Sequence, residues 1–307
     1  MAIPEEQQPV AKRAWQHRAV DALYALAGDW KVWVAITHLA YMLGAYKWHI
    51  ALRVPILFAL VFGILSRYWL TQWRFWGGVT LYYLAHIIYD PYWLANHHYV
   101  LFYTALAMTL STLRGEEGDE ARAVFRHNAR AIMVILMGAA TIQKLLSPSY
   151  RDGSFYAYLI SHGGFGRPLW AWHDQVSATM SLNRHRLWMW FDQPPGQPLE
   201  VTWPYGDLQL WGSVLSWATI GVEAAMALLA LFLPKGRLWA ISALLFVWSL
   251  VLIRQELMFI SLVTLIAALM LDESRPNVRR WQLALCWSWV VFIILPFILK
   301  PLGVWSG

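Results

Sequence analysis

Charged residues and cysteine are both scarce in this chain. Only 14% of its 307 residues are Asp, Glu, Lys or Arg, whereas a soluble domain usually carries roughly 25%. The chain therefore lacks much of the polar surface that water requires, which argues against a soluble domain with a large core. The single cysteine, Cys286, lies within an apolar run, so a disulfide within the chain and a cysteine-based metal site are excluded.

The N-terminal part of the chain has no apolar stretch of the kind that forms a cleavable signal peptide. We therefore expect residues 1–30 to be a polar cytoplasmic segment and residues 31–307 to form one transmembrane domain. The sequence shows no internal repeat and no second soluble domain.

A net charge of +6 would suggest nucleic acid as a partner of a soluble protein. Here the basic residues fall between apolar runs, so the expected partner is the lipid bilayer and no nucleic acid.

Long apolar runs dominate the remainder of the sequence, which is 59% hydrophobic with a mean hydropathy of +0.42. A helix needs about 20 apolar residues to cross a ~30 Å hydrocarbon core. The pattern predicts an all-α, polytopic integral membrane helical bundle with about nine spans, eight being the alternative count. The nine candidates lie near 32–46, 50–66, 76–93, 97–113, 130–147, 209–233, 237–253, 256–271 and 281–300.

The distribution of Lys and Arg predicts the orientation of these spans. Cytoplasmic loops are rich in Lys and Arg, and with the N-terminus inside, every inner gap holds at least two of them, whereas the short outer gaps hold only Lys47 and Arg254. This alternation favours an N-in, multi-pass arrangement. The one long connection, 148–208, then faces outward. Its many tryptophans argue against disorder, and we expect short amphipathic pieces on the membrane surface.

Ionisable and polar residues inside or beside the apolar spans are the candidate functional groups, because burying them in a membrane is costly. The predicted topology places three parts of the chain in one outer layer: Asn96-His97-His98-Tyr99, Lys144, and Arg254-Gln255-Glu256. Glu223, in the middle of a span, has no assigned partner.

Each of these residues also has a purely structural interpretation. Lys144 could extend its amine to the outer interface. Asn96 could be a helix N-cap, and Arg254 and Glu256 could neutralise each other. A metal site is not expected, since adjacent histidines point to different sides of a helix and no acidic or cysteine ligand lies at a suitable spacing.

Two short motifs resemble one known family. The first motif, at the start of an expected helix, is Trp93-Leu94-Ala95-Asn96-His97-His98-Tyr99. The second motif ends an expected span and is Gly138-Ala139-Ala140-Thr141-Ile142-Gln143-Lys144-Leu145-Leu146, in which Lys144 lies 47 residues after His97. Asp152-Gly153 follows it. This order is similar to the membrane domain of vitamin K-dependent γ-carboxylases, which bacteria carry as HTTM (horizontally transferred transmembrane) proteins. Val222-Glu223 and Leu271-Asp272 add a weaker similarity.

The resemblance implies a bacterial inner-membrane enzyme of the carboxylase type with an outward-facing site. Lys144 matches the family's lysine base, which deprotonates reduced vitamin K, here a menaquinol-type lipid quinone, so that it reacts with oxygen. His97 and Asn96 match the family's pair beside the reacting carboxylate, so Lys144, His97 and Asn96 are the expected catalytic residues. The expected substrate-binding residues are His98, Tyr99, Arg254 and Glu256.

Other features leave the activity open. The eukaryotic carboxylases have a large extramembrane C-terminal region, whereas this chain ends about seven residues after its last expected span. A protein or peptide substrate would therefore need another binding region, or a partner subunit that supplies one. The Lys-Leu helix end also resembles the DoxX-like membrane proteins, which makes a quinone-linked oxidoreductase the alternative enzyme. A non-catalytic transporter or membrane subunit is the third interpretation.

Overall fold

A computed structural model describes residues 29–44, 50–89, 96–113, 118–164, 173–192, 200–253, 257–271 and 276–299. Within these ranges the chain forms helices joined by turns and contains no strand, so the prediction of an all-α fold is confirmed. Three helices are long and apolar enough to cross a membrane: Asp119–Leu146, Leu208–Phe232 and Val278–Ile298. These features are those of a membrane-type helical protein, while the number of spans and their orientation stay predictions.

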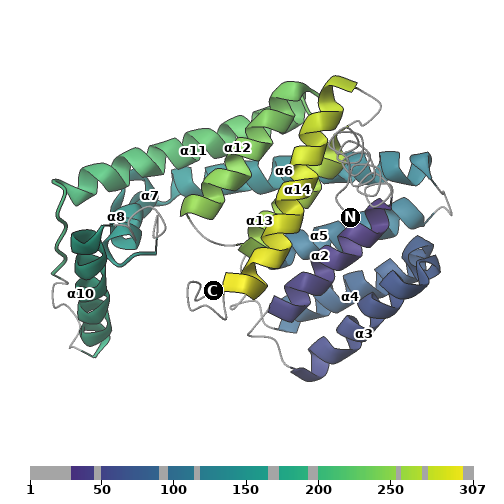
Figure 1. Ribbon diagram of the computed structural model, residues 1–307, viewed down its shortest axis with the longest axis horizontal. Helices are drawn as coiled ribbons and strands as arrows, with labels where there is room; N and C mark the ends of the chain where they lie inside the picture. Colours follow the sequence, from purple (N-terminus) through teal and green to yellow (C-terminus); the bar gives the residue numbers. More distant parts are fainter. Residues whose placement is uncertain are drawn as a thin grey trace, which may run out of the picture. The chain divides into compact units, whose positions relative to one another are not determined.

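The chain divides into two compact units, Met1–Phe125 and Arg126–Gly307, and the boundary falls inside one long helix. The helices of the first unit that precede this boundary helix are α2 (Trp30–Gly44), α3 (Ile50–Ser66), η2 (Tyr68–Thr71), α4 (Trp73–Tyr89) and α5 (Asn96–Thr112). The boundary helix is α6 (Asp119–Leu146), and the second unit continues with α7 (Pro148–Arg151), α8 (Ser154–Ser161), α10 (Asp174–Phe191), α11 (Leu208–Phe232), α12 (Arg237–Ile253), α13 (Leu257–Met270) and α14 (Pro276–Leu299) (Figure 1).

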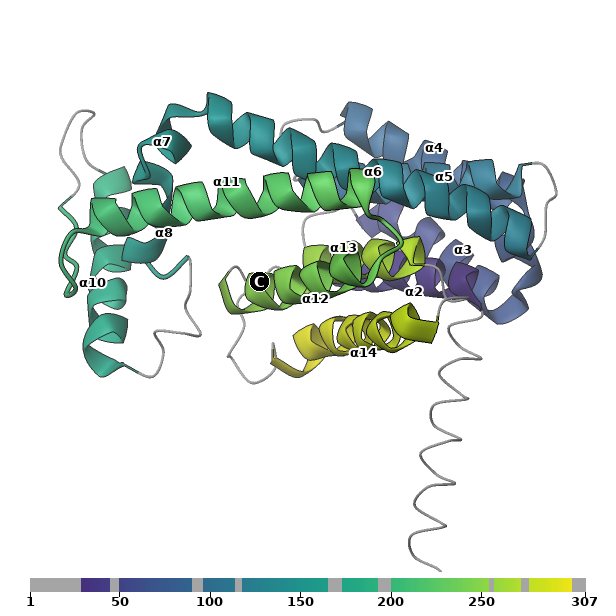
Figure 2. The ribbon, with the colours of Figure 1, turned by 90° about the horizontal axis from the view of Figure 1, so that it is seen from above.

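In the first unit, α4 packs closely along α5, and α2 packs against α3 (Figure 2). The large side chains at its centre are fully buried, among them Trp76, Tyr83 and Met108. The indole N–H of Trp76 donates to the carbonyl of Leu70 at 2.9 Å, which satisfies the polar atom that this aromatic ring brings into the core.

In the second unit, α13 is the most enclosed helix. Every residue from Ile260 to Met270 is buried, and α13 packs against both α12 and α14. A helix that is apolar on all sides has no face suited to water, so it lies at the centre of a bundle. Neighbouring α12 and α14 instead expose apolar side chains such as Leu245 and Trp287.

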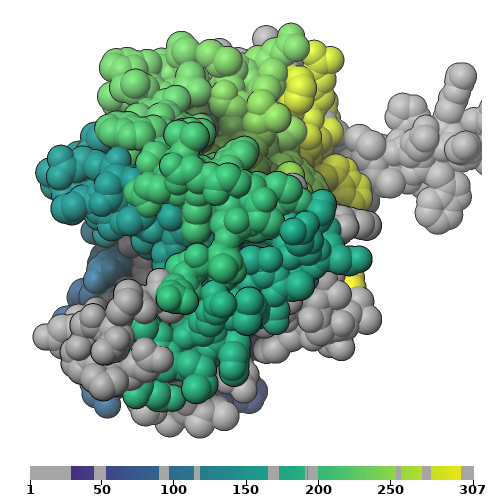
Figure 3. Space-filling model, turned by 90° about the vertical axis from the view of Figure 1, so that its left-hand side faces the viewer, coloured from purple at the N-terminus to yellow at the C-terminus, as the bar shows by residue number. Residues whose placement is uncertain are grey.

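The connection 148–208 contains more helix than its sequence predicts, because α10 alone has 18 residues. The buried amide of Asn183 holds this segment together: its Nδ2 donates to the carbonyls of Ser161 and Thr202 at 2.8 and 2.7 Å, and its Oδ1 accepts from Thr202. Figure 3 looks onto α10 and the beginning of α11. On α10, Leu182, Trp188 and Met189 are exposed.

Candidate functional site

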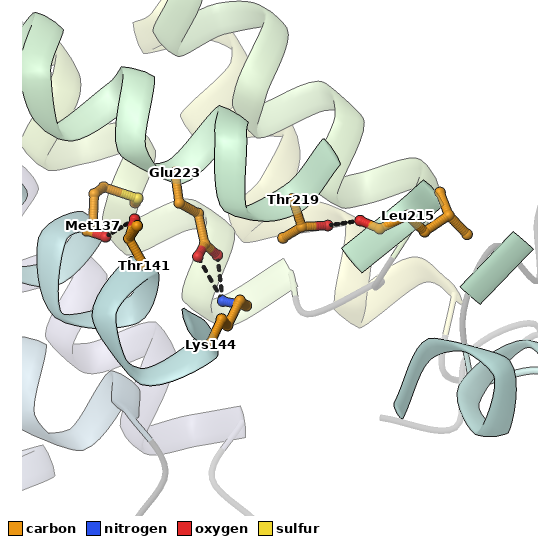
Figure 4. Close-up of polar contacts among 6 residues, drawn as sticks. All are labelled: Met137, Thr141, Lys144, Leu215, Thr219 and Glu223. Carbon is orange, nitrogen blue, oxygen red and sulfur yellow. Dashed lines mark hydrogen bonds and ion pairs between the residues drawn. The ribbon is translucent and has the colours of Figure 1, made fainter. Parts of the chain in front are cut away.

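The second unit contains an ion pair between two apolar helices. Lys144 on α6 donates from Nζ to both carboxylate oxygens of Glu223 on α11, each at 2.6 Å (Figure 4). Only 14% of the lysine side chain and 12% of the glutamate side chain is exposed. A charge that is buried to this extent is costly unless it is paired. The pairing therefore explains how both Lys144 and Glu223 can be buried.

The surroundings of the pair supply an aromatic ring and few free polar groups. Lys144 Nζ lies 5.5 Å from the centre of the Tyr150 ring, within the range of a cation–π contact. The nearby hydroxyls of Thr141 and Thr219 each donate to a carbonyl of their own helix, those of Met137 and Leu215 (Figure 4). These two hydroxyls are therefore already engaged within their own helices.

A close approach of two glycines sets the position of α11. Gly153, with φ of +81°, lies against Gly212, and a Cβ added at either position would come within 3.0 Å of backbone atoms of the other segment. Ser213 Oγ donates to the carbonyl of Asp152 at 2.9 Å, and the amide of Gln209 donates to the same oxygen. The first turns of α11 therefore pack against α7 and α8. Because these turns are occupied in this way, the residue of α11 that lies beside Lys144 is Glu223 and not one nearer the start of the helix.

The Asp152-Gly153 turn also begins α8. The Asp152 carboxylate accepts from the Ser154 backbone N–H at 2.8 Å, and this hydrogen bond holds the pKa of Asp152 below its usual value. Gly153 supplies the left-handed backbone that a residue with a side chain rarely adopts. Asp152 and Gly153, which follow the Lys144 motif in the sequence, therefore have a defined structural role.

Arg130 holds the opposite end of α11. Its Nε donates to the carbonyl of Ala230 at 3.1 Å, and its Nη2 donates to the carbonyl of Leu231. These carbonyls belong to the last turn of α11, where helix hydrogen bonds are lacking and a cation is favoured. Two residues of α6 therefore bind α11: Arg130 at its last turn and Lys144 near its middle.

The first unit contains a separate cluster of histidines and tyrosines on α2, α4 and α5. His38 Nδ1 and the Tyr83 hydroxyl are 2.7 Å apart, and both residues are fully buried. Tyr41 contacts both neighbouring histidines of α5, with its ring centre 5.2 Å from that of His97 and 5.8 Å from that of His98. His38 Nε2 is buried and has no hydrogen-bond partner among the described residues.

The predicted site residues have different outcomes. His98 is buried and its Nε2 lies 3.5 Å from the Tyr41 hydroxyl, while His97 is half-buried and Tyr99 is 38% exposed. Asn96 begins α5, but its side chain lies outside the described residues, as do Arg254 and Glu256. Lys144 and His97 belong to different units, and their expected position in one layer stays a prediction.

Sequence reasoning missed the Lys144–Glu223 pair. Both residues are ionisable, opposite in charge and flanked by apolar runs, which is the signal that could have joined them. Their places in the predicted spans argued against it, because Lys144 lies about one turn from its span end and Glu223 lies near the middle of its span. In the structure, α7 and α8 follow α6 and pack against the first turns of α11, so the end of α6 lies beside the middle of α11. Sequence reasoning also missed Tyr41 as the neighbour of His97 and His98.

No arrangement suited to a metal ion occurs among the described residues, where no group of three or more His, Cys, Asp or Glu side chains could hold one. In the histidine cluster the rings lie face to face or tilted, as for His86 and His98, with centres 5.9 Å apart. No protein-family model, curated protein or solved structure matches the chain.

Proposed function

We propose that the protein is a membrane enzyme that deprotonates a reduced lipid quinone with the Lys144–Glu223 pair, in the manner of the vitamin K-dependent γ-carboxylases that the sequence resembles. The observation that carries the proposal is the pair itself, a lysine held by both oxygens of a carboxylate between apolar helices. Ionisable residues in apolar spans are rare and are functional candidates by default.

The side chains around the pair fit an amphipathic aromatic headgroup. Tyr150 offers a ring beside the amine, and the threonine hydroxyls are occupied by their own helices. A sugar or a nucleotide needs many free donors and acceptors, whereas a quinol needs apolar contact and one strong polar group. A lipid quinone would also reach α6 and α11 directly from the bilayer.

Glu223 gives Lys144 a way to act as a base. A protonated lysine cannot accept a proton, but the Glu223 carboxylate, both oxygens of which lie at hydrogen-bond distance from Lys144 Nζ, can first take one from it. Transfer of one proton from Lys144 Nζ to the Glu223 carboxylate leaves a neutral amine. That amine then takes the proton of a quinol hydroxyl: the O–H bond breaks, an N–H bond forms, and the negative charge on the quinol oxygen lies beside the new ammonium group.

The test is formation of quinone epoxide by purified protein given reduced vitamin K and oxygen, followed by mass spectrometry. We expect epoxide from the wild type and a loss of roughly 10²–10⁴-fold in Lys144→Ala, the usual contribution of a general base. Glu223→Gln, which keeps the shape but cannot take the proton, should also lose most activity. Lys235→Ala, a change at an exposed lysine of the same unit, is the matched control and should keep full activity.

Two results would overturn the proposal. One is full activity in folded Lys144→Ala, which would remove the base. The other is the absence of epoxide from folded wild type, which would favour the quinone-linked oxidoreductase or a non-catalytic transporter. The pair itself suits a transporter as well, since proton-carrying side chains within the membrane also serve proton-coupled transport. Retention of a quinone by the purified protein separates the first of these two alternatives from the second.

A further inference from the structure

A second polar feature of the Arg126–Gly307 unit lies where α11 ends and α12 and α14 begin. The guanidinium carbons of Arg237 on α12 and Arg280 on α14 each lie 5.7 Å from the centre of the Trp281 ring. Both arginines are exposed, and neither has an ion pair or hydrogen bond among the described residues. Lys235, in the turn before α12, is also exposed. This end of the unit therefore presents cations without matching acids in the part of the chain described.

Trp281 adds an unused donor to this cluster. Its indole N–H is buried and has no hydrogen-bond partner among the described residues. A buried donor of this kind normally has an acceptor, so this N–H can donate to a bound group. Guanidinium groups bind phosphate oxygens through paired hydrogen bonds, and two of them lie near this indole ring. The chemistry that suits all three groups is a phosphate anion.

The helix faces beyond the arginines are apolar. On α14, exposed side chains follow Arg280 at helical spacing and on its own face: Trp287, Val291, Ile294 and Ile298. On α12, Trp248 lies on the face of Arg237 and is exposed as well. At about 1.5 Å per residue, the stripe on α14 extends roughly 27 Å from Arg280. A free phosphate would make no use of such a stripe, whereas the acyl chains of a lipid would cover it.

We propose that Arg237, Arg280 and Trp281 bind the phosphate group of an anionic phospholipid, whose acyl chains lie along the exposed faces of α12 and α14. The two guanidinium groups contact the phosphate oxygens, and the indole N–H donates to one of them. Lys235 adds positive charge beside the site. The inference does not rest on the proposed quinone chemistry, because none of these residues belongs to the Lys144–Glu223 pair.

The experiment is native mass spectrometry of the full chain, released from detergent with phosphatidylglycerol or with phosphatidylcholine of the same acyl chains. Each basic residue near an anionic lipid contributes on the order of 1 kcal/mol, so two should give the anionic lipid at least tenfold tighter binding. Arg237→Gln/Arg280→Gln should lose this preference and keep its weak binding of phosphatidylcholine. The single variants should each lose part of it, and Trp281→Phe, which keeps a ring without the N–H, should also bind less.

The matched control removes the same charge elsewhere. Arg74 lies 5.7 Å from the Trp73 ring in the first unit, and Arg151 is exposed on α7. Arg74→Gln/Arg151→Gln should therefore keep the lipid preference. Equal binding of the two lipids by the wild type would overturn the proposal, as would an unchanged preference in the Arg237→Gln/Arg280→Gln variant or an equal loss in the control. Equally tight binding of inorganic phosphate would also overturn it, because the site would then not use the acyl chains.

Discussion

The two units of this protein bury polar groups in different ways. In the first unit, His38, Tyr83, Tyr41 and His98 come together through hydrogen bonds and ring contacts. In the second unit, Lys144 and Glu223 meet as opposite charges. A buried histidine or tyrosine can be satisfied by one neutral hydrogen bond, whereas a buried charge requires a partner of opposite sign. The charged pair should therefore respond far more strongly to the loss of one partner.

The largest effect is expected from breaking the pair on one side. Lys144→Met leaves Glu223 buried without its cation and should lower the free energy of unfolding by about 3 kcal/mol, the usual cost of stranding one member of a buried pair. Lys144→Met/Glu223→Leu removes both charges and should recover most of this loss. Unfolding by a denaturing detergent measures both variants.

The exposed Lys235 provides the control for this prediction, since Lys235→Met should change stability little. A single Lys144→Met variant as stable as the double variant would mean that the pair does not hold α6 to α11. The double variant also separates stability from chemistry, because it should fold well and yet form no epoxide.

A smaller effect is expected at the glycine contact that positions α11. Gly212→Ala places a Cβ against the backbone of Gly153 and Ala157 and should cost about 1–3 kcal/mol, as overpacking does. Gly221→Ala, on the same helix and with open space around it, should be neutral or stabilising by up to about 1 kcal/mol because alanine favours the helix. Thermal unfolding compares the two. Equal stabilities would refute a tight contact between α11 and the α7–α8 turn.

The smallest effect is expected in the first unit. Tyr83→Phe removes the hydroxyl bonded to His38 and should lower the free energy of unfolding by about 1 kcal/mol, the usual net contribution of one hydrogen bond. Tyr103→Phe is the matched control because Tyr103 is 43% exposed. A loss in Tyr83→Phe as large as that in Lys144→Met would abolish the distinction between the neutral and the charged clusters.

Much of the fold could be predicted from the sequence because apolar runs are local signals. The expected segments near 50–66, 97–113, 209–233 and 237–253 correspond to helices α3, α5, α11 and α12 within a few residues. The main boundary difference is α6, which begins at Asp119 rather than near 130. Residues 119–130 carry several charges, so hydropathy alone ends the span there, although the backbone continues as a helix.

The candidate site could be predicted only in part. Lys144 and Glu223 stand out individually, since ionisable groups in apolar runs are conspicuous. Their partnership depends on how far α11 is displaced along α6, and that displacement follows from the contact of Gly153 with Gly212. Neither glycine carries a hydropathy signal that indicates such a contact. In the 148–208 connection short amphipathic pieces were expected, and the length of α10 was not, because the turns around it are held by single residues such as Asn183.

The sequence by itself determined that this protein is helical and of the membrane type, because burial of backbone polar groups in hydrocarbon requires helices wherever long apolar runs occur. It also determined which side chains are too polar for their surroundings. Only the tertiary structure decided that Lys144 meets Glu223 and that Tyr41 meets His97 and His98. Such pairings depend on the relative positions of whole helices, which are set by packing contacts far along the chain from the residues that they bring together.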